Sequence, residues 1–317
     1  MQQESISVIV PTIGRPESLR NLLLSISIQT AKVGEVVVAD GSSAGETEVV
    51  INDPKWRAKG LIVRHVRVQP PNAVRQREAA IGKAEGDLLL LLDDDVVLEP
   101  DCVEQMLEAL AAGPEVVAVT ADFKNESWSR PTKSWRWYLR YVLGLKEGEW
   151  QGRVLGPLLR YGYYTRQSSV QDIEWLGSGN SLIRKSAFDL AGGFSDFFLH
   201  RCTMNEDVDL GLKLSKVGRI LFCSTAMLSH FHAPSGRLSL TEIAEDDLHN
   251  RFFILRCTVG HTKARALRLV LLYHLVETTS DLMGLFRLNM FRNRLRRIYG
   301  RSRALTLILS KSIPIQK

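Results

Sequence analysis

The sequence is poor in cysteine and has no long uncharged apolar run. Its four cysteines, among 317 residues, form no C-x-x-C pair, which argues against a zinc knuckle or a redox dithiol. No stretch reaches the about 18 apolar residues of a membrane-spanning helix. The apolar run Ile6–Val10 stops at Pro11 and is too short for a secretory signal. We therefore expect a cytoplasmic protein with free, buried thiols.

Several common motifs are also missing. The absence of G-x-G-x-x-G disfavours a dinucleotide-binding Rossmann unit, and the absence of G-x-x-x-x-G-K-[ST] excludes a P-loop NTPase. Without G-x-S-x-G, an α/β-hydrolase is disfavoured. With 45% hydrophobic and 24% charged residues, the composition is typical of a globular protein and excludes a disordered, collagen-like or coiled-coil chain.

Charge is spread unevenly along the chain. From Arg251 onward there are 14 Lys and Arg against 2 Asp and Glu, whereas the first 250 residues carry 27 against 33. The net charge of +6 therefore describes the C-terminal region and not the body of the protein. A basic region of this kind indicates an anionic partner, either nucleic acid or a membrane surface.

Short apolar runs alternate with helical patterns in the first 122 residues. We expect strands at Ile6–Pro11, Glu35–Asp40, Leu61–Val66, Asp87–Asp93 and Val116–Asp122. We expect helices at Pro16–Gln29, Asn72–Ala84 and Pro100–Ala112. Leu88–Leu92 is apolar at every position, as in a strand covered on both faces of a parallel sheet. The alternation predicts a layered α/β fold.

The alternating pattern breaks between Lys124 and Glu174, a stretch rich in Trp, Tyr and Arg. We expect helix and loop excursions over the carboxyl edge of the sheet, serving as a plain hydrophobic lid or as an acceptor- or membrane-facing surface. A helix at Val208–Val217 and a strand at Ile220–His230 follow.

Beyond Leu240 the pattern is helical. Leu267–Leu275 and Leu282–Met290 are apolar and are interspersed with arginines. Such helices either pack on a core or lie at a membrane interface. We expect a domain at residues 1–240, with residues 124–176 as its aromatic-rich excursion, and a basic amphipathic helical region at residues 241–317.

Three carboxylates, Asp93, Asp94 and Asp95, follow the all-leucine strand. Burying them together is costly unless a cation neutralises them. Asp93 and Asp95 share a face in extended chain, so both could approach one Mg²⁺ or Mn²⁺. Ligands of open α/β sheets gather at strand carboxyl ends, which favours a metal over a solvated acidic turn.

Two other polar groups stand at element ends. Glu206, Asp207 and Asp209 open the helix at 208, where the helix dipole stabilises carboxylates, so capping explains Glu206 and Asp209 equally well. His230 and His232 share a face after a strand. Either could complete a metal site, although a pair of surface histidines is the commoner case.

Nucleotide contacts have weaker signals. Asp40, before Gly41, could bind a ribose or base at a strand end, or could belong to a plain Asp-Gly turn. Arg75 and Arg77 could reach diphosphate oxygens, or could lie on a solvated helix face.

Taken in order, these residues resemble family-2 glycosyltransferases of the GT-A fold. The matching segments are Val8–Arg15, Asp40–Ser42, Arg77–Ile81, Glu85–Asp87, Asp93–Asp95, Gly177–Ser181, Gly192–Phe194, Glu206–Asp207, His230 and Asn250–Phe253. Gly14 and Glu78 stand where the family commonly has Asn. The resemblance implies a Rossmann-like, mixed and mostly parallel sheet flanked by helices, followed by a basic helical C-terminal extension.

The resemblance also implies an activity, namely inverting transfer of a sugar from a nucleotide-diphosphate sugar, UDP favoured, to an acceptor hydroxyl. The residues it implies for nucleotide binding are Pro11, Thr12, Arg15, Asp40, Arg77, Asp93 and Asp94. Asp95 and His230 would bind divalent Mn²⁺ or Mg²⁺, and Asp207 would be the general base. The residues on the acceptor side would be Gly177, Gly179, Asn180 and Glu206.

The acceptor is expected to be a saccharide or a lipid-linked molecule, met by peripheral association with the inner face of the cell membrane. Nucleic acid is not expected, because no recognition motif accompanies the basic region. Two alternatives remain. A sugar-nucleotidyltransferase would need a Gly-rich basic loop after the first strand, and a non-catalytic membrane-docking scaffold would not need Asp95, Asp207 and His230 together.

Overall fold

The computed structural model describes residues 4–163, 168–200, 204–232, 239–283 and 291–310. These divide into two compact units. The first, here the sheet unit, comprises residues 1–129 and 162–236, and the second, here the helical unit, comprises residues 130–161 and 237–317. The central part of the aromatic-rich stretch is therefore grouped with the C-terminal helices, whereas the sequence placed it with the first 240 residues.

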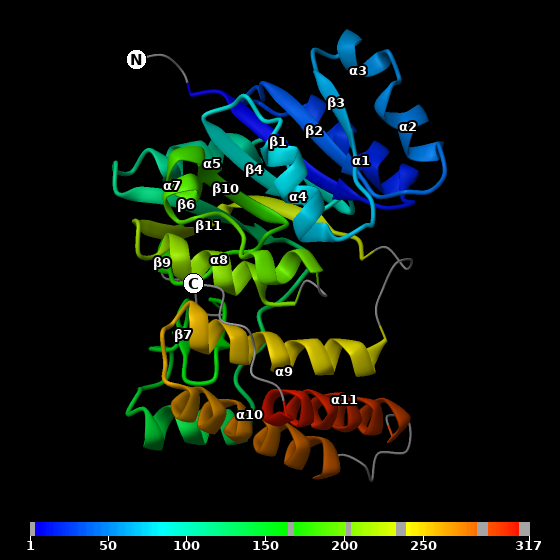
Figure 1. Cartoon of the computed structure of the whole chain (residues 1–317). Helices are drawn as coiled ribbons and strands as arrows, with labels where there is room; N and C mark the ends of the chain where they lie inside the picture. The colour runs from blue at the N-terminus through cyan, green and yellow to red at the C-terminus, as the bar shows by residue number, and fades with distance from the viewer. Residues whose placement is uncertain (1–3, 164–167, 201–203, 233–238, 284–290, 311–317) are drawn as a thin grey trace. The chain divides into compact units, whose positions relative to one another are not determined.

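A nine-stranded mixed sheet forms the sheet unit, in the order β3-β2-β1-β4-β10-β6-β11-β5, with β9 paired to β11 (Figure 1). The strands are β1 (Ile6–Thr12), β2 (Glu35–Asp40), β3 (Val63–Arg67), β4 (Leu88–Leu92), β5 (Val96–Leu98), β6 (Val116–Phe123), β9 (Val170–Ile173), β10 (Asn180–Arg184) and β11 (Arg219–His230). Strands β1 to β4 run parallel, and β10 is antiparallel between β4 and β6. The five strands expected before residue 123 are confirmed, whereas β5, β9 and β10 were not anticipated, β9 lying in the stretch for which helix and loop were expected.

Helices cover both faces of this sheet. They are α1 (Pro16–Ser27), α2 (Glu46–Ile51), α3 (Lys55–Ala58), α4 (Ala73–Ile81), α5 (Cys102–Leu110), α7 (Lys185–Leu190), the 3₁₀ helix η2 (Asp196–His200) and α8 (Glu206–Leu214). Buried side chains of α1 and α5 join alternate residues of β1, β2 and β4 in one core. The five leucines of β4 are at most 1% exposed, as expected for a strand that is covered on both faces.

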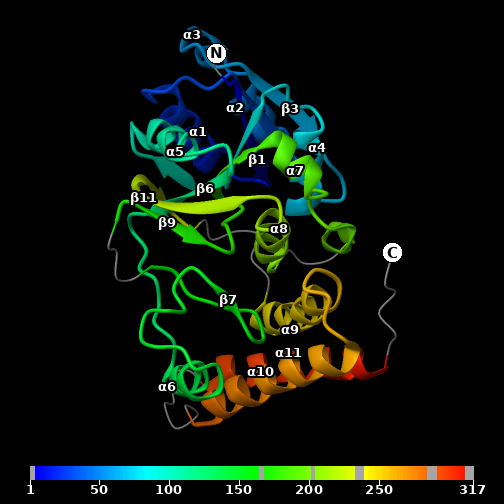
Figure 2. The ribbon, with the colours of Figure 1, turned by 90° about the vertical axis from the view of Figure 1, so that its left-hand side faces the viewer.

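The helical unit contains α6 (Lys133–Trp137), a π-helical turn η1 (Tyr138–Val142), the hairpin β7 (Val154–Leu155) and β8 (Leu159–Arg160), α9 (Leu240–Cys257), α10 (Lys263–Met283) and α11 (Phe291–Ser310). Within this unit α6 lies beside α10 (Figure 2). Trp135 and Leu139 pack with Leu272 and Tyr273 of α10. At Gly300 of α11, a Cβ would lie 2.2 Å from the carbonyl oxygen of Thr241, so glycine permits close approach of α9.

Arg251 of α9 explains why the aromatic stretch belongs to this unit. Its guanidinium donates to the carbonyls of Pro157 at 2.7 Å and Leu158 at 2.8 Å, and pairs with Asp247 at 3.0 Å. It also lies 4.0 Å from the centre of the Tyr273 ring. A buried cation thus links residues 157–158 to α9 and α10.

Two expectations concern individual residues. Cys102 and Cys223 are buried as expected, but Cys257 is exposed at the end of α9, and Cys202 lies outside the described residues. Most of the apolar segment Leu282–Met290 also lies outside them. Among the helices described, none is both long and apolar enough to span a bilayer.

Candidate active site

Asp94 is held at the carboxyl end of the sheet by Thr12, the last residue of β1, and by Arg15, which follows that strand. Its carboxylate accepts from the Thr12 hydroxyl at 2.6 Å and from Arg15 Nη1 at 2.9 Å. Burial raises the pKa of Asp94 to about 6, with the Thr12 hydrogen bond and the Arg15 charge opposing the shift. Asp94 therefore joins β4 to the loop after β1, in reach of the expected nucleotide residues.

Asp95 faces His230, because the end of β11 pairs with β5. His230 is in register with Val96, and the Phe231 N–H donates to the Asp95 carbonyl at 2.9 Å. As a result, His230 Nε2 lies 3.1 Å from Asp95 Oδ1. Burial opposes protonation of this imidazole, but the hydrogen bond and charge of Asp95 outweigh it and raise the pKa of His230.

Asp93 completes a group of three metal-ligating side chains with Asp95 and His230. One ligand atom from each lies within 4.8 Å of the other two. Two carboxylate oxygens and one imidazole nitrogen form a donor set that fits Mn²⁺ or Mg²⁺, and a cation would relieve the repulsion between the two acids. The donor chemistry therefore suits the divalent metal that the sequence suggested.

His232 occupies a different position from His230. Its Nε2 lies 2.9 Å from Glu126 Oε1, and the same oxygen is 3.0 Å from His230 Nδ1. The sequence left open which histidine faces the acidic triplet, and the structure brings His230 to Asp95. Glu126 was missed, because no spacing signal connects the loop after β6 with the end of β11.

Arg77 of α4 connects the acidic triplet with the acidic start of α8. Its Nη2 donates to Asp93 Oδ1 at 2.6 Å, and its Nη1 lies 3.6 Å from Glu206 Oε1. Glu206 also accepts from the Ser178 hydroxyl at 3.1 Å. Burial, followed by the charge of Asp207, raises the pKa of Glu206 to about 7, with Arg77 opposing.

The three acids in the first turn of α8 differ in burial and in hydrogen-bond partners. Asp207 is half-buried, and its Oδ1 accepts from the N–H of Val208 at 2.8 Å. Asp209 is fully buried, accepts from the Ser195 hydroxyl at 2.6 Å and pairs with Lys213 at 3.4 Å. Asp209 thus has structural partners of its own, whereas Asp207 is the more accessible carboxylate.

The segment Gly177–Asn180 approaches the triplet closely. A Cβ on Gly179 would lie 2.3 Å from Asp93 Oδ2, and one on Gly177 would lie 2.1 Å from Asn180 Oδ1. Asn180 is buried and donates to the Ala121 carbonyl at 2.6 Å. Only glycine leaves room here for the Asp93 carboxylate and the Asn180 amide.

Asp40 lies behind the loop that follows β2. It is fully buried, accepts from the N–H of Ser42 at 2.8 Å and lies 3.3 Å from His65 Nε2. The loop borders a hollow of about 280 Å³, which is lined by Ile13, Gly14, Gly41, Ser42, Ser43, Ala44, Glu46, Thr47, Gln69 and Pro71. Pro11 is buried in β1. The sequence gave no sign of the partnership between Asp40 and His65.

The two departures from the family pattern have local explanations. Gly14 has φ +60°, a conformation that both glycine and asparagine tolerate. Glu78 accepts from the N–H of Phe194 at 3.0 Å, which fastens α4 to the Gly192–Phe194 segment. Burial raises the pKa of Glu78.

Arg75 differs from expectation, and Gln76 has a role that was not anticipated from the sequence. Arg75 donates to the carbonyls of Pro70 at 2.9 Å and Leu199 at 2.7 Å, so those guanidinium donors support the backbone. Gln76 is buried and donates to the carbonyls of Thr12 at 2.7 Å and Ala39 at 2.8 Å, which joins the ends of β1 and β2. A glutamine on a helix carries no sequence signal for this role.

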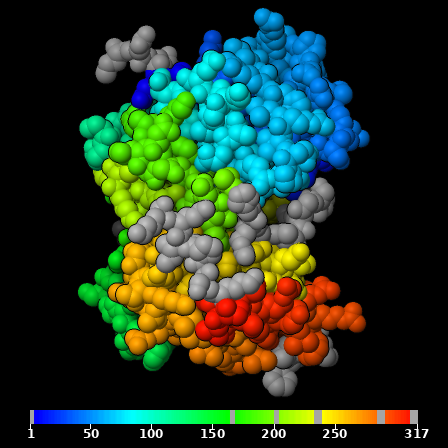
Figure 3. Space-filling view, in the orientation of Figure 1, coloured from blue at the N-terminus to red at the C-terminus, as the bar shows by residue number. Residues whose placement is uncertain are grey.

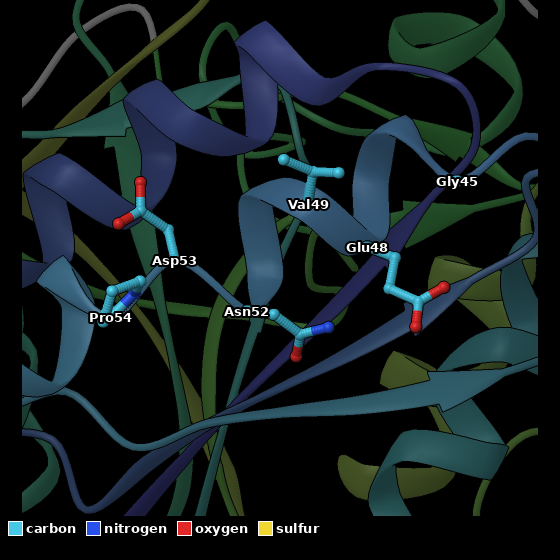
Figure 4. Close-up of a pocket in the computed structure, with 6 residues that line it drawn as sticks. All are labelled: Gly45, Glu48, Val49, Asn52, Asp53 and Pro54. Atoms are coloured by element: carbon cyan, nitrogen blue, oxygen red, sulfur yellow. The ribbon is translucent and has the colours of Figure 1, made fainter.

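A wider hollow of about 590 Å³ lies along α2 and α3 (Figure 4). Its acids have partners already, since Asp53 pairs with Lys55 at 2.9 Å and Glu48 lies 3.8 Å from Arg67. Its lining comes from one continuous segment, residues 45–54, and contributes nothing to the acidic triplet.

A mixed sheet with acids and an imidazole gathered at its strand ends fits the GT-A fold. The model of the family described as "Glycosyl transferase family 2" matches residues 7–189, more than half of the chain. The chain belongs to this family.

Similar proteins agree with that assignment. An N-acetylglucosaminyl-diphospho-decaprenol L-rhamnosyltransferase of Mycobacterium tuberculosis is 26% identical over 258 residues, which cover 75% of this chain and 80% of the relative. S. aureus TarS 1–349 in complex with UDP-GlcNAc is 14% identical, with a TM-score of 0.55 over 96% of this chain and 92% of that one. GalNAc-T7 with UDP, GalNAc and Mn²⁺ is 12% identical, with a TM-score of 0.61 over 98% and 56%. At these identities the two structures establish the fold alone.

Proposed function

We propose that this protein transfers a sugar from a nucleoside-diphosphate sugar, UDP favoured, to an acceptor hydroxyl, with inversion at the anomeric carbon. One observation carries the proposal. The metal-ligating atoms of Asp93, Asp95 and His230 converge within 4.8 Å, and Arg77 joins Asp93 to the Glu206–Asp207 pair. The residues proposed for the donor side and those proposed for the acceptor side thereby lie together at one edge of the sheet.

The donor would bind along the ends of β1, β2 and β4. Pro11, Thr12 and Arg15 border the nucleotide side, and Asp40 shapes the loop through Ser42. The residues expected to meet the ribose and phosphates are Arg77, Asp93 and Asp94. A GT-A neighbour solved with UDP-GlcNAc supports a nucleotide-sugar donor.

Asp95 and His230 would hold a divalent cation, Mn²⁺ or Mg²⁺, with Asp93 beside them. When bound, the cation would neutralise charge on the departing diphosphate. Asp207 would accept the proton of the acceptor hydroxyl as that oxygen forms a bond to the anomeric carbon. The bond from this carbon to the diphosphate breaks, and the diphosphate leaves with the electron pair. Direct displacement inverts the configuration.

Glu206, Gly177, Gly179 and Asn180 would shape the acceptor side. Because burial raises the pKa of Glu206 to about 7, this residue carries a proton during part of its time at neutral pH. Asp207 is proposed as the base because it is the more accessible carboxylate of the two. The two acids are thus given different tasks by their surroundings.

A lipid-linked or saccharide acceptor at the inner face of the cell membrane suits the helical unit. Trp137 and Tyr141 are 60% and 67% exposed, and Met283 of α10 is 75% exposed. The arginine-rich helix α11 adds positive charge to the same unit. Apolar and cationic side chains mixed in this way favour peripheral binding to anionic lipid. The name of the mycobacterial relative includes a lipid diphosphate, and no nucleic-acid partner is proposed.

Donor binding is tested by thermal unfolding of the full chain with UDP, GDP or dTDP, each with Mn²⁺, Mg²⁺ or EDTA. A ligand that binds only the folded state raises the midpoint. We expect one nucleotide to raise it in a metal-dependent way, and we expect the rise to vanish in Asp95→Ala but not in Asp189→Ala, an exposed acid on α7. A shift that survives in Asp95→Ala contradicts the metal assignment.

Turnover distinguishes the remaining possibilities. With a donor identified, Asp207→Asn should retain donor binding and lose about 10²–10⁴-fold in rate. Release of pyrophosphate would instead indicate a sugar-nucleotidyltransferase. Donor binding with no transfer to saccharide or lipid-linked acceptors would favour a non-catalytic docking scaffold.

A further inference from the structure

Three arginines of α11 converge on one carboxylate of α10 within the helical unit. Arg297 Nη2 and Arg301 Nη2 each lie 2.6 Å from an oxygen of Asp281, and Arg294 Nη1 lies 3.5 Å away. The spacing 294, 297, 301 places all three on one helix face. Hydrogen bonds from Arg297 and Arg301 overcome burial and lower the pKa of Asp281, so this carboxylate is ionised.

Positive charge is in excess around Asp281. The other acid of α10 that reaches the cluster is Glu277, which accepts from Trp135 Nε1 at 2.8 Å and whose charge acts on Arg297. His274 lies on the same side of α10, and burial followed by the Arg301 charge lowers its pKa. With His274 neutral, three guanidinium groups face two carboxylates, and an unneutralised cation remains.

Hydrogen-bond donors are also in excess. Arg294 Nε and Arg301 Nε are buried without a hydrogen-bond partner in the described part of the chain. The bonds of Arg294 are long, at 3.4 Å to the Ser280 carbonyl and 3.5 Å to Asp281. A buried guanidinium without good acceptors is costly. Arg301 is 4% exposed, which makes it the buried partner that neutralises Asp281.

The outer edge of this cluster is accessible. The side chains of Arg294 and Arg297 are 17% and 32% exposed, against 5% for Arg301. Arg301 pairs with Asp281 from within, and the partly exposed side chains of Arg294 and Arg297 form the outer edge of the cluster. Planar guanidinium groups with free N–H donors match the oxygens of a phosphate group.

We propose that Arg294 and Arg297 form a binding site for a phosphate group, using the N–H donors on the exposed part of the two guanidinium groups. The site belongs to the helical unit alone and stands whether or not the donor chemistry proposed above is correct. The phosphate can come from a lipid headgroup or from a free phosphate. Exposed Leu282 and Met283 follow Asp281 directly, and exposed Phe291 and Leu295 flank Arg294. This apolar surround favours the lipid source.

The surface of α10 and α11 offers a matched comparison (Figure 3). Arg292 and Arg296 are exposed on the same helix and have the same charge, but they are not among the arginines that contact Asp281. We compare Arg294→Gln/Arg297→Gln with Arg292→Gln/Arg296→Gln in the full chain. Arg294→Gln alone serves as a second variant, since its weak bonds to Asp281 make it the least disruptive change. Thermal unfolding without ligand checks that each variant folds.

Two probes distinguish the source of the phosphate. Inorganic pyrophosphate is titrated by thermal shift, and flotation is measured with vesicles of phosphatidylglycerol or of phosphatidylcholine. We expect binding to weaken about tenfold or more in the 294/297 variant, and in the same direction in Arg294→Gln, but less than about threefold in the 292/296 variant.

If the wild-type protein binds vesicles but not pyrophosphate, and the 294/297 variant loses vesicle binding, the phosphate comes from a lipid headgroup. If the wild-type protein binds pyrophosphate and the 294/297 variant loses that binding, the site accepts free phosphate. Equal weakening in the two double variants would mean diffuse attraction of the basic helix, and would overturn the proposal. So would wild-type protein that binds neither probe.

Discussion

Arg77 donates from Nη2 to Oδ1 of Asp93 at 2.6 Å. Its second terminal nitrogen lies 3.6 Å from Glu206, so one buried cation spans two acidic motifs that are 113 residues apart in sequence. Neither acidic motif is independent of the other, because both share this counter-charge.

Replacing Arg77 by Met should destabilise the protein. Removing one partner of a buried ion pair leaves uncompensated carboxylates, and Asp93 is partly exposed, so we expect a loss of about 2–4 kcal/mol in the free energy of unfolding. Denaturant titration measures it. Arg20→Met, at an exposed ion pair of α1, should cost less than about 1 kcal/mol. Equal costs would show that Arg77 is no more important than a surface arginine.

Gly179→Ala should weaken binding at the acidic triplet more than it destabilises the fold. A Cβ there would lie 2.3 Å from Asp93 Oδ2, so the carboxylate must move away from Arg77. We expect metal-dependent nucleotide binding, measured by thermal shift, to weaken about tenfold or more, in line with loss of one charge-assisted interaction. Gly45→Ala, whose Cβ would meet nothing within 4 Å, is the control. Unchanged binding in Gly179→Ala would show that Asp93 can be displaced without consequence.

Glu206→Gln should change the dependence of stability on pH. The pKa of Glu206 is raised in the folded state from 4.5 to about 7. The folded protein thus keeps a proton that the unfolded chain releases, and this group's contribution to stability is lost as pH rises between those values. Relative to wild type, Glu206→Gln should gain about 1–3 kcal/mol between pH 4.5 and pH 7.

Denaturant titrations at several pH values test that gain. Glu108→Gln, at an exposed position of α5, should show no such trend. A stability difference between Glu206→Gln and wild type that stays constant with pH would contradict the raised pKa.

Arg251→Lys should weaken the helical unit. Lysine keeps the charge but cannot donate at once to the carbonyls of Pro157 and Leu158 and to Asp247, as the guanidinium does. We expect a loss of about 2–4 kcal/mol in unfolding free energy. Arg303→Lys, at an exposed pair with Glu245, should lose less than about 1 kcal/mol. The idea fails if hydrogen exchange of α9 is the same in both variants.

Local patterns sufficed for much of the sheet unit. The leucine run of β4 and the alternation around it predicted the α/β class, because a strand covered on both faces must be apolar throughout. Asp93, Asp94 and Asp95 had to lie at the carboxyl end of β4, where ligands bind in such sheets. Family resemblance added Asp207 and His230, whose roles remain proposals.

Contacts between distant segments could not be predicted in this way. Glu126 meets His230 only because β6 and β11 run side by side, and His65 meets Asp40 through the pairing of β2 with β3. Neither residue has a neighbour in sequence that indicates its partner. The strands β5 and β10 were missed for a related reason, since short strands are defined by the strands they pair with.

The sequence by itself determined the α/β class, the acidic triplet and the basic character of the C-terminal helices, because periodicity, local charge and strand composition are properties of contiguous residues. Tertiary structure decided which carboxylate meets Arg77, which histidine faces Asp95, and that residues 130–161 pack with α9 and α10. These depend on strand order, register and buried ion pairs, which arise only when segments far apart in the chain are brought together.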